Sequence, residues 1–362
     1  MKIKTKVLVI GGGPAGATAA SVLARNGIDT VLIEKNLFFR KPCGGGIPSL
    51  AFEEFYIPRD QIQREVDAVT LVSPGDMRVK VELEPNKLFI VDRGRFDAFL
   101  REKAVNSGAN LIEGRFISSE QSEKLHTSRI LTKDEEIEVR SEYIIAADGV
   151  NSRVRLSQGI KLHPAIFTIS EKISGMTAET CEFWFSSLHA PGFYSWVFPS
   201  TEGISIGTGS REPQKMKHFH DTFKQRRRLH NRATKMSIYR VPAWRGDLYR
   251  QGNIIFAGDS AGQVMPLSYE GIYFAMKSGE LSAEAVLRGD AGLYEKIWKD
   301  KFYTLFLTAA KISSHFLKND RRSEKFVSLL QRPELQKAGK ALWLMKDFRI
   351  HGLNLINLLG DA

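Results

Sequence analysis

Three glycines near the start of the chain have the spacing of a phosphate-binding turn. Gly11, Gly13 and Gly16 follow an apolar run and lead into small residues typical of a helix. This spacing permits a tight turn, lets the backbone approach a pyrophosphate, and lets helix and strand pack closely. A second strand, 29–33, ends in Glu34, whose carboxylate can accept a hydrogen bond from a ribose hydroxyl. The pattern predicts a cofactor that contains ADP; a purely structural glycine turn is the alternative.

A second glycine cluster, Gly44 to Gly46, follows Cys43 directly. Successive glycines remove side chains where the backbone passes close to something large and flat, although a solvent-exposed hinge would also use them. Cys43 could be a redox or proton-relay residue, or only a small apolar filler. Cys181, the other cysteine, precedes an aromatic stretch and could face the same cavity, so a disulfide between the two stays open.

The composition is that of an ordinary globular protein. The chain has 362 residues, 43% hydrophobic and 26% charged, which is enough for two domains or one large interleaved domain. Two cysteines argue against a disulfide scaffold and fit a reducing compartment. The eight histidines lack metal-ligand spacing, and neither cysteine belongs to a CxxC, so we expect no metal. No secretory signal or membrane span is visible, which predicts a cytoplasmic protein; a peripheral position at the inner face of the membrane is the alternative.

The chain carries a formal net charge of +11. Basic residues concentrate in one stretch at 215–235 and in a shorter one at 321–325. Because no nucleic-acid-binding module is visible, we do not expect a nucleic-acid partner. An anionic membrane surface or an acidic electron-donor protein would explain the same charge. A solvated helix face explains any single cluster equally well.

The elements that must position these residues can be read from periodicity. The helix at 92–106 would be capped by Asp92, with Phe96, Phe99, Leu100 and Val105 as its apolar stripe. The remaining elements are a strand at 110–112, a hairpin at 116–139, a buried strand at 143–146, aromatic-rich strands within 165–209, a strand at 253–257, a helix at 271–287, and helices from 294 onward.

Four motifs together resemble the FAD-dependent enzymes that share the fold of p-hydroxybenzoate hydroxylase. They are the glycine turn with Glu34, the DRxxFD-like Asp92-Arg93-Gly94-Arg95-Phe96-Asp97, the DGxxSxxR-like Asp148-Gly149 with Ser152 and Arg155, and the GDAAG-like Gly258-Asp259-Ser260-Ala261-Gly262. The resemblance implies an α/β fold, in which a Rossmann-like FAD-binding domain is interleaved with a mixed or antiparallel β-sheet substrate domain and followed by a C-terminal helical segment. The implied boundaries are 1–65, 92–160 and 250–293 for the FAD-binding domain, 66–91 and 161–249 for the substrate domain, and 294–362 for the helices.

Two further segments are similar to the geranylgeranyl reductase branch of these enzymes. One is Pro42 to Gly46; the other is the YxWxFP segment Tyr194 to Pro199, followed by the GxG at 207–209. The resemblance implies reduction of C=C bonds in a polyprenyl lipid, quinone or diphosphate. One departure is Tyr269, where the branch has glycine near the presumed flavin ring, and this puts the fine shape of the active site in doubt.

The site that follows has three parts. The expected cofactor-binding residues are Gly11, Gly13, Pro14, Ala15, Gly16, Glu34, Lys35, Cys43, Gly44, Gly45, Arg95, Asp148, Gly258, Asp259, Gly271 and Ile272. The expected flavin-proximal residues are Cys43, Gly44, Gly45 and Tyr269. The expected substrate-binding residues are Phe183, Phe185, Tyr194, Trp196, Phe198 and Pro199, for which simple sheet core is the alternative. Period-two spacing places Tyr194, Trp196 and Phe198 on one face of a strand.

Several functional questions stay open at this level. Rival functions on the same fold are a flavin monooxygenase of an aromatic or polyketide substrate and a flavoprotein that passes electrons to a membrane quinone. With one dinucleotide motif, the electron donor would be a transiently bound NAD(P)H or a reduced ferredoxin-like protein. The apolar tail 338–359 could place Trp343, Lys346 and Arg349 at a lipid headgroup boundary, or it could only cap the substrate domain.

Overall fold

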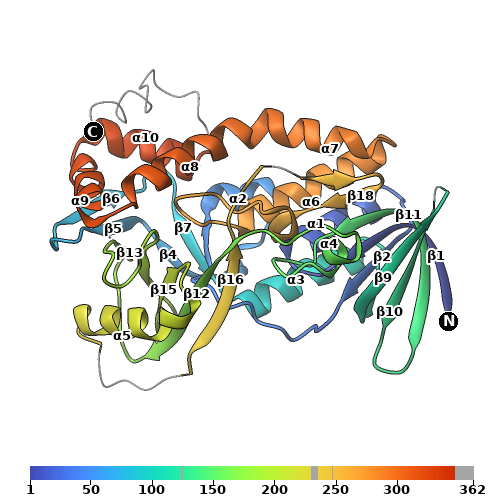
Figure 1. The fold of residues 1–362 in the computed structure, drawn as a ribbon, viewed down its shortest axis with the longest axis horizontal. Coiled ribbons are helices and arrows are strands. Elements are labelled where there is room, and N and C mark those ends of the chain that lie inside the picture. The colour runs from blue at the N-terminus through green and yellow to red at the C-terminus, as the bar shows by residue number, and fades with distance from the viewer. Residues whose placement is uncertain (124, 230–234, 247, 347–362) are drawn as a thin grey trace.

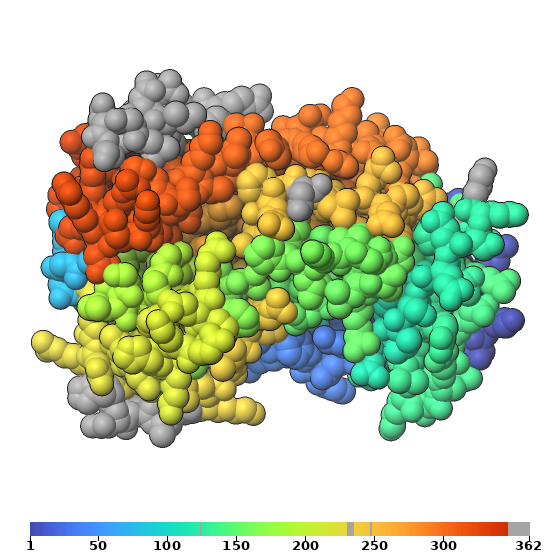
Figure 2. Space-filling model, in the orientation of Figure 1, coloured from blue at the N-terminus to red at the C-terminus, as the bar shows by residue number. Residues whose placement is uncertain are grey.

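The computed structural model describes residues 1–123, 125–229, 235–246 and 248–346. Figure 1 shows a sheet at each end of the long axis, with helices α7 and α8 running along the upper edge between the two parts. The same helices, in orange, cover the upper edge in the space-filling view (Figure 2). This is the α/β fold class expected from the sequence, with a parallel sheet, an antiparallel sheet and C-terminal helices.

The sheet that carries the glycine turn has a parallel core in the order β18–β11–β1–β2–β8. At its margins β17 pairs antiparallel with β18, and the β9–β10 hairpin joins β11. Its strands are β1 (Lys2–Ile10), β2 (Thr30–Glu34), β8 (Asn110–Glu113), β9 (Arg115–Ser122), β10 (Leu125–Leu131), β11 (Glu136–Ala146), β17 (Arg250–Gln251) and β18 (Ile254–Phe256). The carboxyl ends of β1, β11 and β18 therefore meet at one edge, where a parallel sheet places its ligands.

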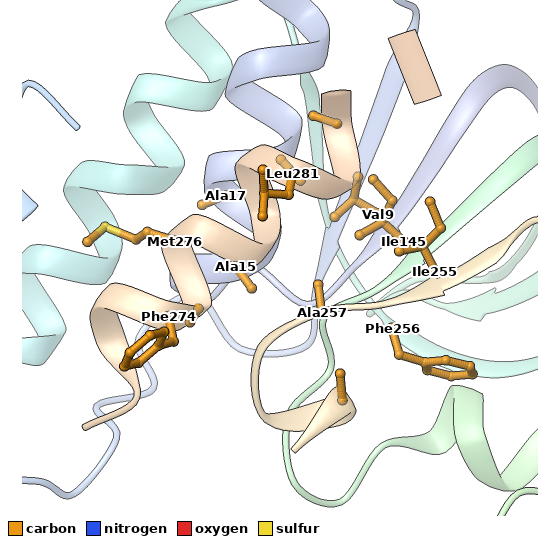
Figure 3. Packing of buried hydrophobic residues seen from close by; sticks show 14 of the residues in the cluster. Val9, Ala15, Ala17, Ile145, Ile255, Phe256, Ala257, Phe274, Met276 and Leu281 are labelled. Carbon is orange, nitrogen blue, oxygen red and sulfur yellow. The ribbon is translucent and has the colours of Figure 1, made fainter. Parts of the chain in front are cut away.

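Helix α1 (Pro14–Arg25) follows the glycine turn and packs against α6 (Ile272–Leu287). The two backbones approach closely because Gly279 of α6 faces α1: a Cβ atom there would lie 2.1 Å from the carbonyl oxygen of Ala15. Figure 3 shows small alanine side chains between these helices and the apolar strand ends. The small-residue helix predicted from the sequence is therefore explained by helix–helix contact as well as by the turn.

The second sheet is mostly antiparallel, in the order β16–β12–β15–β14–β13–β5–β6. Its strands are β5 (Ala68–Val72), β6 (Arg78–Glu82), β12 (Ala165–Ser174), β13 (Cys181–Trp184), β14 (Ser195–Pro199), β15 (Gly203–Ser210) and β16 (Ser237–Pro242). A small sheet connects the two parts, with β7 (Leu88–Val91) between β3 (Gly46–Pro48) and β4 (Ile62–Val66). The division of the chain into domains at the expected boundaries stays a prediction.

Helix α3 begins where the sequence predicted it. The carboxylate of Asp92 accepts two backbone N–H hydrogen bonds from the first turn, as an N-cap does. Phe96 and Leu100 are buried, but Val105 is 43% exposed, so the predicted apolar stripe was wrong at that position. The buried face continues through Ala104 instead, because residues four apart share a face and residue 105 is rotated out of it.

The remaining helices lie around and between the sheets. They are α2 (Ser49–Glu54), α3 (Arg93–Asn106), α4 (Arg153–Ser157), α5 (Met216–Arg226), α7 (Ala291–Trp298), α8 (Thr304–Phe316), α9 (Asp320–Leu329) and α10 (Pro333–Trp343). No described helix combines the length and apolarity that a bilayer span requires. Residues 347–359 of the predicted membrane-facing tail, Arg349 among them, lie outside the described residues.

Candidate active site

A cavity of about 370 Å³ lies between the glycine turn and the antiparallel sheet. Sequence-predicted site residues that line it are Gly11, Gly13, Pro14, Ala15, Glu34, Lys35, Cys43, Gly44, Gly45, Asp148, Phe183, Tyr194, Trp196, Phe198, Gly258, Asp259, Tyr269, Gly271 and Ile272. The fold thus brings together, around one space, residues separated by more than two hundred positions in the chain.

Four predicted site residues lie elsewhere. Gly16 is a packing residue, since a Cβ atom there would lie 1.8 Å from the carbonyl oxygen of Gly11. Phe185 borders a second cavity, and Pro199 is buried at the end of β14. Arg95 points to solvent, 3.6 Å from Asp60, and its side chain is 61% exposed.

The glycine turn has the shape of a phosphate cradle. Gly11 has φ +102°, and a Cβ atom on it would lie 2.3 Å from the carbonyl oxygen of Ala147, so no side chain fits. At Gly13 a Cβ atom would meet nothing within 4 Å. This residue therefore presents bare backbone to the cavity, at the N-terminus of α1, where N–H groups and the helix dipole favour an anion.

The end of β2 holds Glu34 in a fixed position. Its carboxylate accepts hydrogen bonds from the backbone N–H of Gly12 at 2.7 Å and of Asn36 at 3.0 Å. Lys35 lines the cavity beside it. A carboxylate oriented by two backbone donors keeps free lone pairs for a further donor, such as a ribose hydroxyl.

Two further carboxylates, those of Asp148 and Asp259, also line the cavity. Asp148 accepts a hydrogen bond from the backbone N–H of Val154 at 3.1 Å, but its other oxygen is buried and has no partner in the structure. Burial raises the pKa of Asp148. Asp259 forms an ion pair with Lys41. Burial alone would lower the pKa of Lys41, but Asp259 reverses the effect and raises it.

The residues present fit an FAD molecule. The bare turn fits the pyrophosphate, Glu34 fits the adenosine ribose, and the unpartnered oxygen of Asp148 offers an acceptor to a hydroxyl group. Helix α6 begins at the cavity wall, since Gly271 and Ile272 line it. Its N-terminus can favour negative charge there.

Arg93 is a site residue that sequence reasoning missed. Its guanidinium is buried, with Nε and Nη2 donating to the two carboxylate oxygens of Asp97 at 2.9 and 2.8 Å. Its Nη1 lies 3.5 Å from Cys43 Sγ. Burial opposes the charge, yet Asp97 outweighs it and raises the pKa of Arg93. The choice of Arg95 was therefore wrong; the DRxxFD-like motif contained the correct arginine at its second position.

Glycines of the two branch-specific motifs make room for aromatic rings. A Cβ atom on Gly44 would lie 2.3 Å from the ring of Phe198, and one on Gly207 would lie 2.2 Å from the ring of Trp196. The motifs at 42–46 and 194–209 are therefore in direct contact. A larger residue would not fit at Gly44 or Gly207, because the neighbouring ring occupies the space that its side chain would need.

The aromatic wall is built by edge-on contacts. Phe183 lies 5.5 Å from Phe198 and 5.2 Å from Tyr194, measured between ring centroids. The Tyr194 hydroxyl donates to the carbonyl oxygen of Ser268. Tyr194, Trp196 and Phe198 all line the cavity, as period-two spacing predicted. The sheet thus presents an aromatic surface to the cavity that also contains the glycine turn.

Tyr269, where the resemblance led us to expect glycine, adopts φ +52°. Its ring lies 4.2 Å from that of Phe193, measured between centroids. Burial raises the pKa of Tyr269 to about 12. The tyrosine therefore occupies a strained backbone position and closes part of the cavity with its ring.

The neighbouring Glu270 forms an ion pair with Lys346, whose side chain is only 3% exposed. Burial raises the pKa of Glu270 and lowers that of Lys346. The ammonium also donates to the carbonyl oxygen of Trp343. The predicted headgroup role of Lys346 was therefore wrong, because its charge is turned inward and neutralised. Trp343 likewise lines the cavity.

The two cysteines are both free. Cys43 borders the cavity, whereas Cys181 is fully buried in β13 and belongs to neither cavity wall. The disulfide considered from the sequence is absent. Burial raises the pKa of the Cys181 thiol, which makes it an inert apolar residue. Within the described parts of the chain, no group of three or more His, Cys, Asp or Glu side chains could hold a metal ion.

Much of the basic stretch at 215–235 is paired within the molecule. Lys215 pairs with Glu212, Lys224 with Glu171, Arg226 with Asp76 and Arg227 with Glu182. Three of these pairs tie α5 and the turn after it to the antiparallel sheet and its β5–β6 connection. For Lys224, Arg226 and Arg227 the expectation of a free cationic surface was wrong, because their ion pairs connect α5 and the turn after it to the antiparallel sheet.

Comparison with known proteins is consistent with this geometry. A family model described as an FAD binding domain matches residues 4–47 and 49–281. The geranylgeranyl diphosphate reductase of Rhodobacter capsulatus is 30% identical over 385 residues, covering 99% of this chain and 98% of that protein. The digeranylgeranylglycerophospholipid reductase of Methanocaldococcus jannaschii is 29% identical, over 84% of this chain and 85% of its own length.

The fold also matches a solved structure. A geranylgeranyl bacteriochlorophyll reductase-like protein from Thermoplasma acidophilum superposes with a TM-score of 0.85 at 24% sequence identity. The match covers 96% of this chain and 98% of that one. It confirms the predicted fold class, an FAD-binding α/β fold with C-terminal helices.

Proposed function

This chain belongs to the geranylgeranyl reductase family of FAD-dependent oxidoreductases, and we propose that it hydrogenates C=C bonds of a polyprenyl lipid, quinone or diphosphate. One observation carries the proposal. The cavity that contains the glycine turn and Glu34 is the same cavity that Tyr194, Trp196 and Phe198 wall with aromatic rings. A flat apolar chain and a dinucleotide can therefore share one space.

Reduction of an isolated alkene needs a hydride at one carbon and a proton at the other. FAD, once reduced, supplies the hydride. The protein must hold the allylic chain flat and exclude water. Phe183, Tyr194, Trp196 and Phe198 supply such a wall, and each is buried or nearly so.

We assign the cofactor-binding role to the residues that line the cradle. These are Gly11, Gly13, Pro14, Ala15, Glu34, Lys35, Cys43, Gly44, Gly45, Asp148, Gly258, Asp259, Gly271 and Ile272, to which we add Lys41 and Arg93 because they line the same cavity. Cys43 accepts a hydrogen bond from Arg93 and borders the cavity, so it is placed to relay a proton. Tyr269 would shape the flavin-proximal space.

The electron donor and the working environment belong to the same proposal. A single dinucleotide turn leaves NAD(P)H as a transient visitor or a reduced ferredoxin-like protein as the donor. A lipid substrate favours action at an anionic membrane surface from the cytoplasmic side. The surplus of basic residues, 52 Lys and Arg against 41 Asp and Glu, supports that location.

The experiment that tests the function separates it from its rivals. Protein reduced with dithionite is incubated without oxygen with geranylgeranyl diphosphate, and separately with a geranylgeranyl glycerophospholipid, and the products are weighed by mass spectrometry. A gain of hydrogen mass is expected. A gain of oxygen under air would instead indicate a monooxygenase, and flavin reoxidation by a quinone without alkene reduction would indicate an electron-transfer protein.

A further inference from the structure

A second cavity, of about 180 Å³, lies behind the aromatic wall. One side is the β5–β6 hairpin, with Val69, Leu71 and Val81; the other is formed by α8, α9 and α10. Ser268, Gln336 and Lys340 are the polar or charged members of its lining apart from the aromatic Tyr194 and Trp343. We call this space the apolar chamber. An apolar space of this kind does not hold ordered water, so it suits a hydrocarbon ligand.

The chamber adjoins the cavity that contains the glycine turn, which we call the flavin-side cavity. Phe183, Tyr194, Ser268 and Trp343 border both spaces. The rings of Phe183 and Trp343 meet edge-on, with centroids 5.9 Å apart and planes at 87°. A molecule that passes from one space to the other must pass these rings.

Contacts of Lys346 hold the end of α10, which lies at the boundary between the two spaces. Trp343 is the last residue of α10, and its carbonyl oxygen accepts a hydrogen bond from Lys346. Lys346 is paired with Glu270 and lies over the rings of Tyr273 and Phe274, at 5.1 and 5.0 Å from their centroids. A buried ion pair and two cation–π contacts thus fix the end of α10, and they hold Trp343 at the boundary between the two spaces.

We infer that Trp343 determines chain-length specificity: with Phe183 it forms the constriction through which the distal isoprene units of the substrate enter the apolar chamber. The inference rests on the proposed function. The occupant is a polyprenyl chain because the chamber is apolar, adjoins the flavin-side cavity and shares the rings of Phe183 and Trp343 with it. How far the chain reaches past Trp343 then sets which of its double bonds lies in the flavin-side cavity.

Gly339 offers a way to fill the chamber without disturbing its walls. It lines the chamber from α10, and a Cβ atom there would have Leu330 Cδ2 as its nearest neighbour, at 3.9 Å, which is ordinary contact. Gly339→Phe therefore places a ring in the chamber. Lys337→Phe is the matched control, because it adds the same ring to the exposed side of the same helix.

Binding of geranyl, farnesyl and geranylgeranyl diphosphate to the oxidised FAD-loaded protein is measured by calorimetry. Each methylene group that loses its buried site weakens affinity about fourfold. We expect Gly339→Phe to weaken geranylgeranyl diphosphate at least about tenfold while geranyl diphosphate stays within about twofold. Lys337→Phe should leave the whole series unchanged. An equal effect of Gly339→Phe on all three lengths would overturn the inference.

A second measurement uses the wild-type protein, so its outcome does not depend on whether a variant folds. A geranylgeranyl diphosphate analogue with a photoreactive diazirine at its distal end is crosslinked to the wild-type protein, and labelled peptides are identified by mass spectrometry. Labels on chamber residues such as Leu71, Phe326 or Leu330 are expected. Labels confined to the flavin-side cavity or to the surface would contradict the assignment.

The two proposals fail in different ways. If the wild-type protein neither binds nor reduces any member of the series, the proposed function and this inference both fall. If it reduces geranylgeranyl diphosphate but shows no length-dependent loss in Gly339→Phe and no label in the chamber, only the role of Trp343 falls. Trp343→Ala should further change the ratio of partly to fully reduced products, and Trp343→Phe should change it less.

Discussion

The position of Glu34 at the end of β2 leads to a direct test of cofactor binding. Two backbone donors orient its carboxylate, so the remaining lone pairs face a defined direction. Glu34→Gln keeps the shape but replaces an acceptor oxygen with a donor amide. Because a hydrogen bond to a charged group contributes about 1.5–3 kcal/mol, we predict roughly a tenfold to hundredfold weaker FAD affinity.

The measurement is FAD titration into apoprotein, together with the ratio of flavin to protein after purification. Glu113→Gln is the matched control: Glu113 ends the neighbouring strand β8, where it accepts a hydrogen bond from the Leu37 N–H at 3.3 Å and does not line the cavity. Wild-type FAD affinity in Glu34→Gln would count against the ribose assignment.

His189 gives the protein a predictable response to acid. Its Nε2 lies 2.9 Å from an Arg226 nitrogen, which can only donate, so Nε2 is an acceptor and the proton sits on Nδ1, bonded to Ser195 at 2.8 Å. Burial, reinforced by Arg226, lowers the pKa of His189 to about 3. Ser195 donates in turn to Thr208, so the variable positions of the branch motifs form one buried network.

The sign of the pH dependence follows from this shift. Between pH 6.5, the ordinary pKa of histidine, and about 3, the unfolded chain binds a proton at His189 and the folded protein does not. Stability therefore falls as the pH falls through this range, with a contribution of up to about 1.4 kcal/mol per pH unit. Urea unfolding of His189→Gln should show a shallower acid slope, whereas the exposed control His218→Gln should keep the wild-type slope. Identical slopes in all three proteins would contradict the assignment.

Residues that line the cavity were predictable where each belongs to one short sequence motif. The glycine turn, Glu34 and Asp259 are local signals, and each lines the cavity. The error between Arg93 and Arg95 has a physical cause. Both lie in the first turn of α3, and only packing against Asp97 and Cys43 turns one of them inward.

At the scale of elements, contact between a loop and strand β14 explains why the cluster after Cys43 contains glycine. A Cβ atom on Gly44 would meet only the ring of Phe198, with the nearest ring atoms at 2.3 and 2.5 Å. We predict that Gly44→Ala destabilises the fold by about 1–3 kcal/mol, as overpacking does, and weakens prenyl binding by displacing the ring. Thermal unfolding and prenyl diphosphate titration measure the two effects.

A compensating variant makes this prediction specific. Phe198→Ala removes the ring atoms with which the new methyl group would collide, so Gly44→Ala should cost less stability in the Phe198→Ala background than in the wild type. A double-mutant cycle should give a coupling energy of about 0.5–3 kcal/mol. Strict additivity would indicate that Gly44 is required for another reason.

The elements themselves were largely predictable, because β1, α1, β2 and the N-cap of α3 rest on local patterns. Their assembly was not. The apolar chamber joins β5 and β6 with α8 to α10, segments more than two hundred residues apart, and each segment alone looks like ordinary core. Lys346 shows the same limit, since a lysine in an apolar tail suggests a membrane interface until its buried partner Glu270 is known.

At the scale of the whole molecule, the distribution of charge decides how the protein could meet a membrane. Four cations of the stretch at 215–235 form internal ion pairs, and exposed cations also lie on the helices that wall the apolar chamber. Lys311, Lys318, Arg321 and Lys325 are exposed on or beside α8 and α9. Arg322, Lys325 and Lys318 contribute, after burial, to lowering the pKa of His315, which places them in one cationic cluster.

A cationic surface beside a chamber for a lipid chain predicts the face that approaches the bilayer. We expect the protein to float with anionic vesicles and less with neutral ones, and we expect the bound fraction to fall as salt rises, because the attraction is screened within about 10 Å at moderate ionic strength. The triple variant Lys311→Glu, Lys318→Glu, Arg321→Glu should lose most of this binding. Reversal of three exposed cations on or near α5, Lys215, Lys217 and Arg228, is the control for net charge. If both triple variants lose binding equally, total charge rather than the α8–α9 face attracts the membrane, and indifference of the wild type to lipid charge would remove the membrane from the proposal.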